Sequence, residues 1–295
     1  MRTLIVITGP TGVGKTAAAI KLAQHLGCDI INADSRQIYR GIPICTAAPT
    51  PEELAAARHH FVAIKDLEES YSAAQFESDV LALLPSLWQQ GDTVVMCGGS
   101  MLYVDAVCRG IDQLPDISPE VRTAVKEKLH AHGLESLVAE LEQLDPAYAA
   151  TIDRKNTSRV CHGVEICRQA GVPYSTLRTG MAKQRDFQII KLALNIDREQ
   201  LFDRINARVD RMIEAGLEQE ARSVYHLRHL NSLNTVGMKE MFAIMDGTMD
   251  RHTAIERMKK NTRVYAKKQL TWYRRDPSIT WVAPSDAVST ALSLL

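Results

Sequence analysis

Residues 4–16, LIVITGPTGVGKT, decide the fold of this chain. The apolar, mostly β-branched run at residues 4–7 predicts a buried strand, and the alanine-rich stretch at 17–26 predicts a helix. Between them, residues 9–16 read G-x-x-x-x-G-K-T, in the strand–loop–helix context of a phosphate-binding P-loop. The sequence therefore predicts that a phosphorylated ligand binds at this turn.

The residue types in the loop suit a diphosphate. Glycines at 9, 12 and 14 let the ligand approach the backbone N–H groups, and the following helix N-terminus adds partial positive charge. Lys15 is expected to reach phosphate oxygens, and the Thr16 hydroxyl to hold a Mg²⁺ ion that neutralises them. The expected diphosphate-binding residues are Gly9, Pro10, Thr11, Gly12, Val13, Gly14, Lys15 and Thr16.

Composition indicates an ordinary globular protein. The chain has 295 residues, of which 45% are hydrophobic and 24% charged. Its six cysteines form no C-x-x-C pair, which favours reduced thiols over a disulfide framework. Neither a signal-peptide pattern nor a membrane-length apolar run is present. We expect a soluble, cytoplasmic monomer with no membrane partner.

The formal net charge of zero hides a segregation of charge. Residues 251–275 carry nine basic side chains against Glu256, which gives +8, whereas residues 112–145 carry eight acidic and three basic ones, which gives −5. The basic stretch also contains Tyr265, Trp272 and Tyr273. It suits a surface that binds a nucleic-acid backbone and stacks on bases, although a charged helix with aromatic core residues fits the same pattern.

The order of apolar runs predicts an α/β fold with a doubly wound parallel sheet of the P-loop NTPase type. Further strands are expected at residues 28–33, 93–97, 188–196 and 280–282. Helices are expected at residues 72–90, 199–215, 217–230 and 251–273, and another begins at residue 101. Residues 118–184 show helical periodicity without a strand. We therefore expect a core at 1–112, a helical insertion at 113–186, and core completion with basic C-terminal helices at 187–295.

Polar residues follow two of these strands. Asp34 comes directly after the second strand, and Ser100 follows the third strand after Gly98 and Gly99, where parallel strands deliver their loops to the ligand edge. Asp34 could act as a base or metal ligand or form only a turn, and Ser100 could simply cap the next helix. Arg204, Arg208 and Arg211 share one helix face, which is either solvated or directed at phosphate.

Taken together, these motifs resemble the tRNA dimethylallyltransferases. The resemblance rests on GPTGVGKT (9–16), NADSRQIYRG (32–41), YSAAQF (71–76), GGSMLY (98–103), LDP (144–146), RINARVDRMIEAGL (204–217), TVGMKE (235–240) and TRVYAKKQLTWYRR (262–275). It implies transfer of a dimethylallyl group from dimethylallyl diphosphate to N6 of the adenosine at position 37, immediately 3′ to the anticodon of tRNA.

The resemblance also implies roles for individual residues. Lys15, Thr16 and Mg²⁺ would stabilise the departing diphosphate, Asp34 would be the general base, and Ser100 would contact the target nucleotide. The insertion would hold the anticodon stem-loop. Residues implied in tRNA binding are Asp34, Ser35, Arg36, Gln37, Ser100, Arg122, Ser158, Arg159, Val160, Cys161 and His162.

Four positions depart from the family pattern. Cys45 and Ala48 replace a glycine and a lysine, His162 replaces an arginine, and Met238 replaces an aromatic residue. These departures suit a diverged paralogue with altered tRNA or donor choice. Separate alternatives are a P-loop kinase for a nucleoside or small metabolite, a transferase acting on free adenine nucleotide, and a non-catalytic RNA-binding relative.

Overall fold

The computed structural model describes every residue from Met1 to Leu295 and divides the chain into two units. The first unit comprises Met1–Arg109 and Gln184–Leu295, and the second is Gly110–Lys183. None of the helices combines the length and the apolar composition that crossing a membrane would need.

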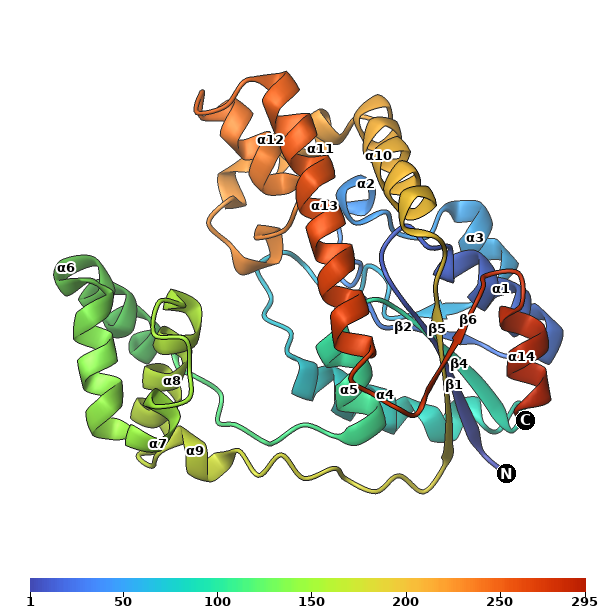
Figure 1. Ribbon diagram of the computed structural model, residues 1–295, viewed down its shortest axis with the longest axis horizontal. Coiled ribbons are helices and arrows are strands. Elements are labelled where there is room, and N and C mark those ends of the chain that lie inside the picture. Colours follow the sequence, from blue (N-terminus) through green and yellow to red (C-terminus); the bar gives the residue numbers. More distant parts are fainter. The chain divides into compact units, whose positions relative to one another are not determined.

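A six-stranded parallel sheet forms the centre of the first unit (Figure 1), with the strand order β3-β2-β4-β1-β5-β6. The strands are β1 (Thr3–Thr8), β2 (Ile30–Asn32), β3 (His59–His60), β4 (Thr93–Cys97), β5 (Gln188–Leu194) and β6 (Ile279–Val282). Because all strands run the same way, the loops that leave β1, β2 and β4 meet at one edge. The predicted α/β class with a parallel sheet is confirmed.

The middle of the sheet is covered on both faces, which explains why β1 is an uninterrupted apolar run. Residues Leu4 to Ile7 are completely buried. Leu4 and Val6 pack with α4 (Ala73–Leu87) and α5 (Met101–Arg109), whereas Ile5 and Ile7 pack with α1 (Lys15–Leu26) and α14 (Ala287–Ser293). Alternate side chains of one strand thus belong to two hydrophobic cores.

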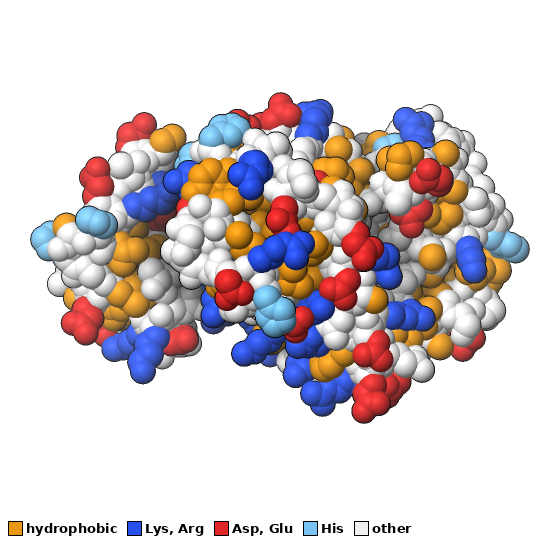
Figure 2. Space-filling model, turned by 90° about the horizontal axis from the view of Figure 1, so that it is seen from above, with side chains coloured by type: hydrophobic (Ala, Val, Ile, Leu, Met, Phe, Trp, Pro, Cys, Tyr) orange, Lys and Arg blue, Asp and Glu red, His pale blue; other side chains and the backbone are white.

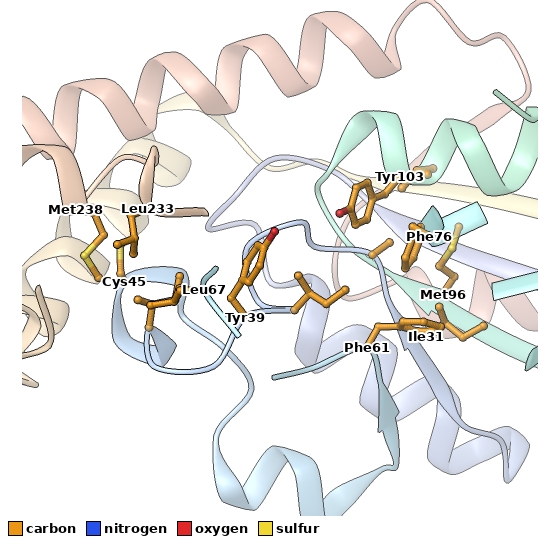
Figure 3. Close-up of a cluster of buried hydrophobic side chains, with 14 of the residues drawn as sticks. Ile31, Tyr39, Cys45, Phe61, Leu67, Phe76, Met96, Tyr103, Leu233 and Met238 are labelled. Atoms are coloured by element: carbon orange, nitrogen blue, oxygen red, sulfur yellow. The ribbon is translucent and has the colours of Figure 1, made fainter. Parts of the chain in front are cut away.

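Aromatic side chains fill the core on the α4 and α5 side (Figure 3). Phe76 stacks on Tyr103, with ring centroids 4.4 Å apart, and meets Phe61 edge-on at 5.3 Å. The same cluster extends to Cys45 and Met238, which lie side by side in Figure 3. This core therefore joins the sheet to the helices at the ligand edge.

Further helices of the first unit are α2 (Pro43–Thr46), α3 (Pro51–Ala56), α10 (Arg198–Glu214), α11 (Leu217–Ser223), α12 (Met238–Met245) and α13 (Arg251–Tyr273). The long helix α13 packs against α10, α12 and α5. Its predicted bounds are confirmed, and the Asp250 side chain caps it by accepting from the Thr253 N–H at 2.9 Å.

The second unit is entirely helical. It contains α6 (Pro119–Leu144), α7 (Pro146–Ala149), α8 (Thr157–Ala170) and α9 (Tyr174–Leu177). A non-helical backbone at Gly133, with φ of 72°, breaks α6 so that its two halves turn. Its own core, which includes Leu137, Leu141 and Val164, makes it a separately packed body.

Two predicted helix ends are wrong, and one strand was not predicted. The helix expected at 217–230 ends at Ser223, whose hydroxyl donates back to Glu220 O at 2.7 Å, and short 3₁₀ turns follow at Tyr225–Leu227 and Asn231–Leu233. The helix expected at 72–90 ends at Leu87 and finishes in tighter turns. The two-residue strand β3 was not expected, because so short an edge strand has no periodicity to detect.

Candidate functional site

The loop between β1 and α1 has the backbone geometry that phosphate binding needs. Gly14 has a φ of 104° and Gly9 a φ of 132°, in the region that side chains disfavour. A Cβ at Gly9 would lie 2.6 Å from Leu194 O, so a side chain at this position would clash with the backbone of β5. The loop therefore exposes backbone N–H groups beside the N-terminus of α1.

The Lys15 side chain folds back over this loop. Its Nζ donates to Gly9 O at 3.1 Å and to Pro10 O at 2.9 Å. Burial lowers the pKa of Lys15 to about 8, because the charged form loses solvation without gaining a carboxylate in contact. An incoming phosphate would supply that missing negative charge.

A cavity of about 540 Å³ opens in front of the loop. Its lining includes Lys15 and Thr16 together with Asp34, Ala48 and Glu53. The cavity also receives Arg204, Arg208 and Arg211 from α10 and Tyr265 and Gln269 from α13. Cys97 at the end of β4 and Gly98 and Gly99 after it complete the lining, so residues from six separate segments of the chain meet here.

The three arginines of α10 line this cavity. The structure therefore favours a helix face directed at phosphate over a solvated one. Arg204 donates to Val13 O at 3.3 Å, so it also braces the phosphate loop. Burial lowers the pKa of Arg208, although a guanidinium remains charged at neutral pH. With Lys15, the three arginines make the cavity strongly attractive to a diphosphate.

Asp34 is half-buried and combines a turn role with a place in the cavity lining. Its Oδ1 accepts from the N–H groups of Arg36 at 2.9 Å and Gln37 at 3.3 Å. Only one carboxylate oxygen is needed for this turn, which leaves the other for a ligand. Both roles considered for Asp34 from the sequence are therefore compatible.

Ser100 does not cap the helix that follows it. Its Oγ accepts from the Ser35 N–H at 2.8 Å and lies 3.1 Å from the Ser35 hydroxyl, and its side chain is buried. The hydroxyl instead ties the loop after β4 to the loop after β2. The capping alternative fails because the hydroxyl faces the neighbouring loop.

A second cavity of about 340 Å³ adjoins the first and shares Thr11, Asp34, Arg208 and Tyr265 with it. Its lining is partly apolar, with Ile205, Val209, Met212 and Met258. Polar groups come from Ser35, Arg36, Ser100 and Lys239. Asp34 thus stands between a highly cationic chamber and a mixed one. This arrangement can hold a charged group and an uncharged group on either side of one carboxylate.

Two further side chains hold the loop around α2, and sequence reasoning missed one of them. Gln37 donates to Thr46 O and Ala47 O at 3.0 and 2.9 Å. Glu220 accepts from the N–H groups of Ile44 and Cys45 at 2.7 and 2.8 Å, and burial raises its pKa. No local pattern marks Glu220, because its partners lie some 176 residues away in sequence.

The departures at Cys45 and Ala48 have different surroundings. Cys45 is buried beside Gly237, where an added Cβ would lie 2.7 Å from its sulfur, and burial raises the pKa of its thiol to about 12. It is a packing residue. Ala48 lines the first cavity, where the arginines of α10 already supply positive charge.

The second unit has a hollow of its own, lined by Ser158, Arg159 and His162 of α8 together with Tyr148, Tyr174 and Arg178. The Arg178 guanidinium lies 5.5 Å from the Tyr174 ring centroid, and His162 meets the same ring edge-on. Burial and the nearby Arg122 lower the pKa of His162. Cys161 is only half-buried.

Val160 is an exception among the expected tRNA-contacting residues. Its side chain is completely buried in the core of the second unit, so it presents no side-chain surface to a ligand. The prediction for its side chain is therefore corrected, because α8 turns this position inward.

Basic side chains of α13 are largely exposed. The exposed ones on the helix are Arg251, Arg257, Lys260, Lys267 and Lys268, and Arg274 and Arg275, which follow it, are exposed as well. Figure 2 shows Lys and Arg side chains gathered along the lower edge of the face seen there, between scattered acidic ones. The positive charge expected from the sequence is thus accessible to a polyanion.

Comparison with known proteins places the chain in a family. The sequence model described as IPP transferase matches residues 37–276. The chain belongs to the IPP transferase family. The chain is 50% identical over 295 residues to "tRNA dimethylallyltransferase 2" of Parabacteroides distasonis, covering 99% of each sequence. It is 51% identical over 293 residues to a protein of that name from Porphyromonas gingivalis, covering 99% of this chain and 98% of the relative.

Solved structures of the family have the same fold. The full-length tRNA isopentenylpyrophosphate transferase of Bacillus halodurans is 34% identical, with a TM-score of 0.72, over 100% of this chain and 95% of that one. A eukaryotic dimethylallyltransferase, solved acting on tRNA, is 25% identical, with a TM-score of 0.80, over 100% of this chain and 78% of that one. The six-stranded α/β architecture is that of the family.

Proposed function

We propose that this chain is a tRNA dimethylallyltransferase. It transfers a dimethylallyl group from dimethylallyl diphosphate to N6 of adenosine 37 of tRNA and releases diphosphate. The observation that carries this proposal is the pair of adjoining cavities, one lined by the phosphate loop and three arginines and the other partly apolar, with Asp34 lining both. A donor diphosphate and an acceptor base can thus meet at one carboxylate.

The first cavity supplies the chemistry of the leaving group. The loop N–H groups, Lys15 and Arg208 surround the place where the diphosphate binds, and they stabilise the charge that develops as the allylic carbon–oxygen bond breaks. The neutralisation of several phosphate charges at once makes diphosphate a good leaving group.

A magnesium ion fits the same chamber. The Thr16 hydroxyl lines the cavity next to Lys15, and Mg²⁺ is commonly bound through few protein oxygens together with phosphate oxygens and water. When bound, the ion supplies further neutralisation of the diphosphate. Thr16 is the residue of this chain that would hold it.

Asp34 is the group placed to receive a proton. The N6 amine of adenine is a weak nucleophile, so it must be aligned with the donor carbon as well as deprotonated. The N6–carbon bond forms, the carbon–oxygen bond of the donor breaks, and the N6 proton passes to Asp34. The hydrogen bonds between Ser35 and Ser100 hold the Asp34 turn against the loop after β4.

The adenine must leave the anticodon-loop stack to reach Asp34. The second cavity offers it a partly apolar wall with polar groups at Ser35, Arg36 and Ser100. Gln37 stabilises this region, because its side chain donates hydrogen bonds to Thr46 O and Ala47 O in the α2 loop. The base is therefore bound by shape and by a few hydrogen-bonding groups.

The rest of the tRNA is bound by two surfaces. The second unit, with Arg122 and the α8 residues Ser158, Arg159, Cys161 and His162, takes the anticodon stem-loop, and the exposed basic residues of α13 contact phosphates. Each of the two cavities is lined by residues of this chain, and we propose that it acts as a monomer. The six unpaired cysteines support a reducing cytoplasm.

The proposal is tested with two unmodified tRNA transcripts that differ only at position 37. The purified chain, Mg²⁺ and radiolabelled dimethylallyl diphosphate are incubated with each. Label should enter the transcript with adenosine at that position and not the one with guanosine. Equal labelling of both transcripts, or transfer to free adenine nucleotide in place of tRNA, would refute it.

A further inference from the structure

Gln269 of α13 joins two loops that line the first cavity. Its side chain is only 1% exposed. Its Oε1 accepts from the Thr11 N–H at 2.8 Å, and its Nε2 donates to Gly99 O at 2.8 Å. Thr11 belongs to the phosphate loop, and Gly99 belongs to the loop that follows β4. One amide group therefore holds both loops against α13.

The surroundings of Gly99 explain why this side chain is neutral. A Cβ at Gly99 would lie 2.5 Å from Gln269 Nε2 and 3.4 Å from Lys15 Nζ. The amide of Gln269 and the ammonium of Lys15 therefore lie against the same side of Gly99. A carboxylate at position 269 could not donate to Gly99 O, and it would attract Lys15 away from an incoming phosphate.

The contacts also explain why the side chain is polar. The Thr11 N–H and the Gly99 carbonyl are both directed at the buried amide. An apolar residue of the same size would leave a buried donor and a buried acceptor without partners, and the two loops would move to find new ones. The phosphate loop would then lose the fixed geometry on which anion binding depends.

We propose that Gln269 is a positioning residue for the donor site. It holds the phosphate loop and the Gly99 loop in the arrangement that binds diphosphate, and it leaves Lys15 free of a competing anion. The identification of the ligand as the donor diphosphate rests on the proposed function, whereas the clamp itself rests on the contacts above.

The first test is the binding of inorganic diphosphate, with Mg²⁺, to the wild-type chain and to Gln269→Leu. The variant should bind diphosphate about tenfold more weakly, while its affinity for tRNA stays within twofold of wild type. Thr271→Ala is the matched control, because Thr271 is exposed on the same helix and its hydroxyl donates to Lys267 O. It should bind diphosphate as the wild type does.

The second test uses Gln269→Glu and does not depend on the leucine variant folding. A protonated glutamic acid can donate and accept as glutamine does, whereas the carboxylate cannot. The charged or titratable groups that line the same cavity are common to both proteins. They are Lys15, Asp34, Glu53, Cys97, Arg204, Arg208, Arg211 and Tyr265. The diphosphate affinity of the variant, divided by that of wild type at the same pH, should therefore rise as the pH falls.

The outcomes separate the two proposals. If the ratio for Gln269→Glu does not change with pH, or if Gln269→Leu folds and binds diphosphate within twofold of wild type, the positioning role is refuted. A wild-type chain that binds diphosphate but does not modify tRNA would count against the proposed function alone, because diphosphate binding still reports on Gln269.

Discussion

Replacing Lys15 with methionine should make the protein more stable and at the same time inactive. Burial lowers the pKa of Lys15 from 10.5 to about 8, so its ammonium is disfavoured in the folded chain relative to the unfolded one. The difference, 10.5 minus 8, corresponds to about 3 kcal/mol of unfolding free energy. This cost is fully present below about pH 8 and disappears as the pH rises toward 10.5.

The net gain should be smaller than that figure. Part of the Lys15 side chain is accessible to solvent, and its Nζ donates to the carbonyl oxygens of Gly9 and Pro10, which methionine cannot replace. Discounting for both, we expect a gain of about 1–2 kcal/mol at pH 7. For a chain of this size, that is a rise of roughly 2–6 °C in the melting temperature.

The assay is thermal unfolding at pH 7 without donor, followed by a transfer assay. Lys21→Met is the matched control, since Lys21 is exposed on the same helix and its loss should change stability by less than about 0.5 kcal/mol. Lys15→Met should melt above this control and transfer no dimethylallyl group. A variant that melts below the control would show that burial of the Lys15 ammonium does not cost stability. A variant that keeps wild-type transfer would show that Lys15 is not needed for the reaction.

Three further outcomes follow from the site. Asp34→Asn should slow transfer about a hundredfold or more while tRNA affinity stays within a few-fold, and an undiminished rate would remove Asp34 from the mechanism. Burial lowers the pKa of Lys15 to about 8, so the side chain loses its positive charge above that pH. The kcat/KM for the donor should therefore fall above about pH 8 in the wild type but not in Lys15→Arg. If the two pH profiles are the same, Lys15 is not the group that titrates. Binding of tRNA should weaken steeply with salt, and replacing both Lys267 and Lys268 with alanine should reduce the slope of log affinity against log salt by about 2; an unchanged slope would exclude phosphate contacts there.

The parts of the fold that sequence predicts well are those specified by local pattern. The phosphate loop, β4 and α13 have strong periodicity or a motif with a known geometry, and their predicted positions agree with the structure. The helix expected at 217–230 fails because apolar spacing persists after Ser223 although the chain has turned into 3₁₀ segments. Periodicity reports which side chains are buried and is blind to this change of backbone.

The candidate site was only partly predictable because many of its contacts join residues that are far apart in the sequence. The spacing of Arg204, Arg208 and Arg211 predicts a shared face, but only the packing of α10 shows that the face lines the phosphate cavity. Gln269 meets Thr11 across 258 residues of sequence, so no local pattern can reveal the contact. Residues that act through long-range hydrogen bonds emerge only once the helices are in place.

The reaction proposed for this chain joins a dimethylallyl group to a tRNA adenosine. The measurement that tests it most directly is the mass of the nucleosides released from a tRNA that has been incubated with the purified chain, dimethylallyl diphosphate and Mg²⁺. We predict an adenosine heavier by one dimethylallyl group, which is absent when the chain carries Asp34→Asn. Bound tRNA whose nucleosides all keep their original masses would contradict the claim and favour a non-catalytic RNA-binding protein.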